Sequence, residues 1–170
     1  MFIASHPEPP GHLLLDFDAT DDPTHGKQEG HFFHGYYDHH CFLPLYVFCG
    51  DELVTAYLRK SNIDAAKHAR AVLKLLVRAL RAAWPAVRIT IRADSGFCRW
   101  KLMRWCDSHG IGYVLGLAKN AVLKDAACDE IARAQWQFQK TGQPQRLFGS
   151  FTYAASSWDR KRRVIVKAEH

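Results

Sequence analysis

Residues 13–22 read Leu13-Leu14-Leu15-Asp16-Phe17-Asp18-Ala19-Thr20-Asp21-Asp22, so three consecutive apolar residues run directly into four carboxylates. A short apolar run that ends in turn-forming residues is typical of a strand covered on both faces. In open α/β sheets, ligands bind just beyond the carboxyl ends of the strands. The stretch therefore predicts a buried strand that ends in an acidic site.

A second stretch has the same design and reads Val87-Arg88-Ile89-Thr90-Ile91-Arg92-Ala93-Asp94-Ser95-Gly96-Phe97. If the two strands are parallel neighbours, Asp94 meets Asp16 or Asp18 at one edge of the sheet. Carboxylates placed this close repel each other unless they are protonated or bridged by a cation. Because hard oxygen ligands favour Mg2+ or Mn2+, the pattern predicts a divalent metal site. The alternative is that Asp94 and Ser95 only cap the helix that follows.

Charge is distributed unevenly within a net charge of +6. Residues 1–57 hold one Lys and nine acids, whereas residues 58–170 hold 22 Lys or Arg and eight acids. An acidic segment that binds cations, joined to a basic remainder, suits a metal-dependent enzyme acting on nucleic acid. A solvated basic surface is the alternative interpretation.

The five Cys form no Cys-x-x-Cys pair, which argues against a zinc ribbon or a disulfide framework and favours a reducing compartment. No apolar segment is long enough for a signal sequence or a membrane span, so we expect a cytoplasmic protein without membrane contact. His25, His31, His34, His39 and His40 match no zinc-binding spacing, and we assign them structural or surface roles.

The remaining pattern predicts an α/β domain. Aromatic-rich segments between 31 and 58 indicate antiparallel strands, and residues 64–83 indicate a helix that Asn62 or Asp64 caps and Trp84-Pro85 ends. The cations of that helix form either a solvated face or a DNA contact; they are Lys67, Arg70, Lys74, Arg78 and Arg81. Further expected elements are a helix at 99–109, a strand at 112–118, a helix at 122–138 that buries Ile131 and Trp136, and a hairpin of 147–153 with 163–168.

Two known families share the first acidic pattern. Asp16-Phe17-Asp18-Ala19-Thr20 resembles the Asp-x-Asp-x-Thr signature of haloacid-dehalogenase-like phosphatases. That resemblance implies Asp16 as the nucleophile and Asp18 as its acid-base partner. In that family a cap or helix follows the signature, whereas antiparallel aromatic strands are expected here.

The second resemblance covers most of the chain. It is carried by Asp18-Ala19-Thr20-Asp21-Asp22-Pro23 with His25-Gly26-Lys27-Gln28-Glu29-Gly30, by His34-Gly35-Tyr36-Tyr37, by Leu43-Pro44-Leu45 and by Arg92-Ala93-Asp94-Ser95-Gly96-Phe97. These segments resemble the catalytic core of bacterial insertion-sequence transposases of the DDE class. The resemblance implies a ribonuclease-H-like fold with three antiparallel strands, a helix, and two parallel strands that each carry a helix.

Carried over to this sequence, the resemblance makes Asp18 the first catalytic acid and Asp94 the second, both holding Mg2+ or Mn2+. We expect Asp16 to face away from Asp18 along the strand, and Asp16 is the alternative first acid. The implied substrates are double-stranded DNA at terminal inverted repeats and at a target site. The full-length protein is expected to be a homodimer and to associate with the bacterial nucleoid.

The chain departs from the family pattern near its end. The third acid of the family is a Glu within a Tyr-x-x-Arg-x-x-x-Glu pattern, which residues 1–170 do not contain. Glu169 lies in a strand-like context, so we expect the third acid beyond residue 170. The expected division is an irregular segment 1–12, a partial core 13–146, and the start of a β-rich insertion 147–170. We expect such a fragment to be inactive alone, with Arg160 to Arg163 binding DNA backbone, or to be a DNA-binding remnant without catalysis.

Overall fold

The structure, a computed structural model, describes residues 2–170. It divides into two compact parts, which we call unit 1, up to Leu117, and unit 2, Ala118–His170. The sequence interpretation set the boundary at residue 146. In the structure, residues 118–146 instead group with the C-terminal hairpin.

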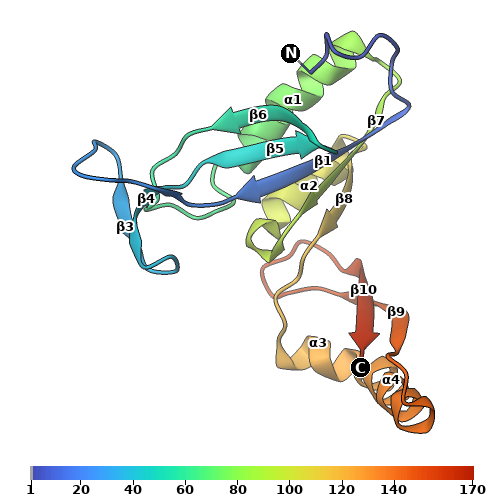
Figure 1. The fold of residues 1–170 in the computed structure, drawn as a ribbon. Helices are drawn as coiled ribbons and strands as arrows, with labels where there is room; N and C mark the ends of the chain where they lie inside the picture. The colour runs from blue at the N-terminus through green and yellow to red at the C-terminus, as the bar shows by residue number, and fades with distance from the viewer. Residues whose placement is uncertain (1) are drawn as a thin grey trace. The chain divides into compact units, whose positions relative to one another are not determined.

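Unit 1 is built on a five-stranded mixed sheet in the order β6-β5-β1-β7-β8 (Figure 1). The strands are β1 (His12–Ala19), β5 (Leu45–Cys49), β6 (Glu52–Tyr57), β7 (Arg88–Ala93) and β8 (Gly112–Leu115). β5 runs antiparallel to β1 and β6, whereas β7 runs parallel to β1 and β8. Three antiparallel strands followed after a helix by two parallel strands make a ribonuclease-H-like sheet, which confirms the expected fold class.

The core of unit 1 lies between one face of this sheet and two helices, α1 (Ala69–Ala83) and α2 (Trp100–Ser108). Along β1, Leu13, Leu15 and Phe17 are buried, while the residues between them are more accessible. Side chains of a strand point alternately to its two faces, so one face of β1 is closed and the other is partly open. The sequence interpretation had both faces covered. Each fully buried side chain of this size contributes roughly 1.5–3 kcal/mol.

Helix α1 ends at Trp84, as the Trp84-Pro85 pair predicted. Its start differs from the expectation, because neither Asn62 nor Asp64 caps it. The N-cap is His68, whose backbone is left-handed with φ 69°. The Asp64 carboxylate instead pairs with Arg99, at 2.6 Å between Oδ2 and Nη2, so it holds the turn before the helix.

A second, small sheet follows β1 directly and has the order β2-β4-β3. Its strands are β2 (Asp22–Pro23), β3 (Phe32–His34) and β4 (His39–Phe42). β3 and β4 form a hairpin in which His34 pairs with His39 across the connecting loop. This sheet carries the aromatic and His-rich segment beyond the carboxyl end of β1.

Unit 2 holds α3 (Ala121–Ala126), α4 (Cys128–Thr141), β9 (Arg146–Tyr153) and β10 (Arg162–Glu169). The antiparallel β9–β10 hairpin confirms the expected paired strands. The helix expected at 122–138 is instead two helices that break at Ala127. Ile131 and Trp136 were predicted to be buried, but they are 47% and 56% exposed, and Ala134 is the buried residue of α4. Across residues 2–170, the helices are too short or too polar to cross a membrane.

Candidate active site

Asp18 is the next-to-last residue of β1 and its side chain is exposed. Residues two positions apart in a strand project to the same face. Asp16 and Asp18 therefore lie on one face of β1, opposite to Leu15 and Phe17. The expectation that Asp16 faces away from Asp18 was wrong, because the side-chain period of a strand is two. Both carboxylates belong to the more open face of the sheet.

Asp16 is held by Arg92 of the neighbouring strand. Arg92 Nε lies 2.5 Å from Asp16 Oδ1, and Arg92 Nη2 lies 2.7 Å from Asp16 Oδ2. This two-pronged geometry matches the planar guanidinium to both carboxylate oxygens. The Asp16 carboxylate accordingly raises the pKa of Arg92 above its ordinary value. Asp16 is thus already neutralised by a cation of the protein.

Asp94 follows β7 and begins the short 3-10 helix η1 (Ser95–Phe97). Its Oδ1 accepts a hydrogen bond of 2.7 Å from the Gly96 backbone N–H. The sequence offered a cap of the helix at 99–109 as the alternative role for Asp94, whereas in the structure Asp94 caps η1 and the N-cap of α2 is Arg99. A carboxylate has two oxygens with about four lone-pair sites, so one cap bond leaves it further capacity as a ligand.

Two glycines allow the backbone around Asp94 to close up. A Cβ on Gly96 would lie 2.9 Å from Asp94 Oδ1, so a side chain there would press on the carboxylate. A Cβ on Gly116, just past β8, would lie 2.7 Å from the Ser95 backbone nitrogen. The Gly116 N–H also donates to the Ala93 carbonyl at 2.9 Å. Asp94 is therefore held between its own cap and the end of β8.

The parallel register of β1 and β7 relates the two candidate acids. Asp16 pairs with Arg92 and Phe17 with Ala93. Asp94 follows Ala93 directly, and Asp18 follows Phe17 directly, so both acids stand one step past the last pair. Neighbouring strands lie about 4.8 Å apart in the hydrogen-bonding direction. The backbone thus brings both positions to the carboxyl ends of two neighbouring strands.

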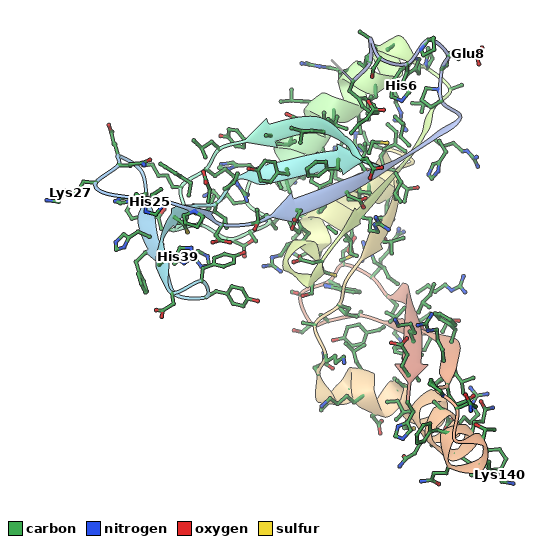
Figure 2. The ribbon with its side chains drawn as sticks, in the orientation of Figure 1. His6, Glu8, His25, Lys27, His39 and Lys140 are labelled. Atoms are coloured by element: carbon green, nitrogen blue, oxygen red, sulfur yellow. The ribbon has the colours of Figure 1, made fainter. Side chains whose placement is uncertain are left out.

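The hairpin beyond β1 adds groups to which the sequence interpretation gave no role in the site. His39 Nε2 lies 2.7 Å from Asp21 Oδ2, which ties β4 to the acidic segment after β1. Burial, together with the charges of Asp21 and Asp18, raises the pKa of Tyr37. Figure 2 shows His39 in this hairpin, in the same region as His25 and Lys27. Only the tertiary pairing of β2 with β4 shows that this segment adjoins the acids.

Glu169 lies in β10 of unit 2, and its carboxylate is paired with two cationic side chains. Its Oε1 is 2.8 Å from Arg146 Nε, and its Oε2 is 2.9 Å from Lys167 Nζ. Hydrogen bonds from Lys167 and Arg146 lower the pKa of this carboxyl. Within residues 2–170, no group of three or more His, Cys, Asp or Glu side chains is arranged to hold a metal ion.

Comparison with known proteins identifies the family. Residues 1–170 match the family model of the transposase DDE domain group 1. No curated protein matches the chain.

Several solved structures are similar to this chain at low sequence identity. The catalytic domain of Mos1 mariner transposase is 13% identical, with a TM-score of 0.45, over 78% of this chain and 62% of that chain. A piggyBac transposase in a synaptic complex with hairpin DNA is 10% identical, with a TM-score of 0.47, over 93% and 33%. The HTLV-2 integrase catalytic core domain in complex with magnesium is 12% identical, with a TM-score of 0.32, over 79% and 77%. The chain thus spans less than two thirds of the length of either transposase.

Proposed function

Since this chain belongs to the family of the transposase DDE domain group 1, we propose that it is part of a transposase catalytic core in which Asp18 and Asp94 are the first two acids. The observation that carries the proposal is the β1–β7 register, which aligns Asp18 and Asp94 at the carboxyl ends of two neighbouring strands. The reaction is cleavage of a DNA phosphodiester by water, followed by joining of the freed 3′-hydroxyl to a target.

The donor set at this edge fits a hard divalent cation. Asp18 is exposed and Asp94 uses one oxygen for its cap, so both carboxylates have oxygen lone pairs to offer. Two neighbouring carboxylates and no sulfur ligand favour Mg2+ or Mn2+ over zinc. Such an ion, when bound, activates the attacking and leaving oxygens of an in-line displacement at phosphorus. Asp16 does not join this set, because Arg92 holds both of its oxygens.

The partner is double-stranded DNA, at terminal inverted repeats and at a target site in a bacterial cell. The charge distribution supports this choice, since residues 58–170 hold 22 Lys or Arg against eight acids. Two transposon ends must be held together during transposition, so the full-length protein acts as a homodimer.

We further propose that the 170-residue chain alone does not transpose DNA. Mg2+ tolerates incomplete octahedral coordination badly, and residues 2–170 contain no third carboxylate arranged beside Asp18 and Asp94. Glu169 is paired with Arg146 and Lys167. Metal binding by the chain should therefore be weak but measurable.

The test is Mn2+ titration of the purified chain, followed by calorimetry or electron paramagnetic resonance. Asp18→Asn and Asp94→Asn should each weaken Mn2+ binding at least about tenfold, because each removes a ligand charge. The matched control is Asp22→Asn, an exposed carboxylate of the same acidic segment, which should leave Mn2+ binding unchanged. Equal losses in all three variants would mean that the segment binds cations diffusely and that the assigned pair is wrong.

A non-catalytic DNA-binding remnant is the second candidate, and the two-carboxylate donor set favours it. It predicts salt-sensitive DNA binding with no dependence on Mn2+. The paired state of Asp16 argues against the phosphatase resemblance, because a carboxylate held by Arg92 at both oxygens is a poor nucleophile. If the chain hydrolysed p-nitrophenyl phosphate and Asp16→Asn lost this activity, the phosphatase interpretation would be favoured instead.

A further inference from the structure

A groove between α1 and α2 carries three cationic side chains. Its lining consists of Lys74, Val77, Arg78, Arg81 and Ala82 of α1 together with Trp105 and His109, and its volume is about 560 Å3. Both helices pack on the face of the sheet that holds Leu15 and Phe17. The groove therefore lies on the helical side of unit 1, whereas Asp16 and Asp18 belong to the opposite face of β1.

The cations of α1 form one stripe along the helix. Arg70, Lys74, Arg78 and Arg81 are spaced by four, four and three residues, which places them within an arc of about 80° at 100° per residue. From first to last they span about 16 Å at 1.5 Å per residue. The stripe adjoins the buried arc of the helix, on the side where Trp105 of α2 and His109, the residue that follows α2, line the groove.

This stripe is unfavourable for the helix by itself. Cations at i and i+4 repel each other, and α1 contains no acidic residue to compensate them. Arg70 also lies in the first turn, where a helix prefers negative charge. A polyanion in the groove would relieve the repulsion between Lys74 and Arg78, which water around a solvated face does less well.

The wall opposite the stripe is ordered by contacts within unit 1. The Trp105 and His109 rings stack with centroids 4.2 Å apart and planes at 24°. Lys74 Nζ lies 6.0 Å from the Trp105 ring centroid, and Arg81 Nη2 donates to the His109 carbonyl at 3.0 Å. The groove thus pairs a row of cations with a fixed aromatic wall, which suits a phosphate backbone whose sugars pack on the ring.

We propose that the α1–α2 groove binds the phosphate backbone of double-stranded DNA without sequence preference. The proposal rests on the proposed function only in taking DNA as the polyanion. It adds a second DNA contact, on the side of the sheet away from Asp18. A protein that holds transposon ends and a target has use for such a surface, because more than one DNA segment must be bound.

The test is the salt dependence of binding between the full 170-residue chain and a duplex that carries no terminal repeat. Each phosphate contact contributes about −0.9 to the slope of log K against log salt concentration. The double variant Lys74→Gln/Arg78→Gln should therefore make the slope shallower by about 1.8. Between about 50 and 200 mM salt, the variant should lose about twelvefold less affinity than the wild type.

The matched control is Lys124→Gln/Lys140→Gln, which removes the same charge from exposed positions of unit 2. An equal change of slope in both double variants would show a net-charge effect and overturn the groove assignment, as would an unchanged slope in the α1 variant. Unchanged Mn2+ binding in Asp18→Asn would overturn the active-site proposal alone, whereas an unchanged slope in Lys74→Gln/Arg78→Gln would overturn the groove proposal alone.

Discussion

Replacement of Gly116 by alanine should damage the candidate site through the backbone. The new Cβ would lie 2.7 Å from the Ser95 nitrogen and 3.0 Å from the Asp94 carbonyl carbon, whereas ordinary contact begins at 3.4 Å. Backbone atoms cannot rotate away, so the end of β8 and the Asp94 segment must separate. Overpacking of this kind costs about 1–3 kcal/mol, which corresponds to a fall in Tm of about 2–12 °C for a chain of this size.

The same displacement should weaken metal binding, because ligands must be held to within about 0.5 Å of their working geometry. We expect Gly116→Ala to lower Mn2+ affinity about tenfold, measured by titration alongside thermal unfolding. The control is Gly11→Ala, where a Cβ meets nothing within 4 Å, and both quantities should stay at the wild-type values. A lower Tm with unchanged Mn2+ affinity would refute Asp94 as a ligand. An unchanged Tm would refute the close packing of Gly116 on the Asp94 segment.

Three further measurements test the core, a buried thiol and the third acid. Leu15→Ala removes a side chain with no exposed surface and should cost about 3–5 kcal/mol of unfolding free energy in urea, with Leu53→Ala, an exposed position, as its control. Burial raises the pKa of Cys106 to about 12, so the unfolded thiol ionises first as pH rises. The free energy of unfolding should then fall by about 1.4 kcal/mol per pH unit above pH 9. This fall should be absent in Cys106→Ala and should persist in the control Cys128→Ala. Glu169→Gln should leave Mn2+ affinity unchanged, and a loss matching that of Asp18→Asn would place the third acid at Glu169.

Much of the fold of unit 1 follows from patterns in the sequence. The apolar strand that begins at Leu13 and the helix expected over 64–83 reappear as the two sides of the core, although only alternate residues of β1 are buried. These patterns predict elements reliably because burial must follow the period of the strand or helix. The start of α1 was less predictable, since its N-cap is a left-handed His68 rather than a polar side chain.

Unit 2 was harder to predict from the sequence. The break at Ala127 has no Gly or Pro to mark it, and α4 buries Ala134 while leaving Ile131 and Trp136 exposed. A helix that packs on a two-stranded hairpin has little apolar surface to cover, so its largest apolar residues need not face inward. Periodicity alone therefore misassigned its buried side.

The candidate acids were predicted by a motif, and their partners were not. Asp16 and Arg92 are 76 residues apart in sequence, so only the β1–β7 register reveals that the Arg92 guanidinium binds the Asp16 carboxylate. The same holds for His39 and Asp21, which meet because β4 pairs with β2. A motif identifies residues by type and spacing, whereas their electrostatic state depends on pairings across strands.

The register of β1 links the stability of the core to the position of the acids. A slip of one residue would turn Leu15 and Phe17 outward and Asp16 and Asp18 into the core. Burial of a carboxylate without a partner is far more costly than burial of leucine, so the apolar residues and the acids select the same register. Asp94 depends on this choice as well, because its strand is aligned to β1 through the Phe17–Ala93 pair. A change in the core that shifted this register would therefore displace Asp18 relative to Asp94.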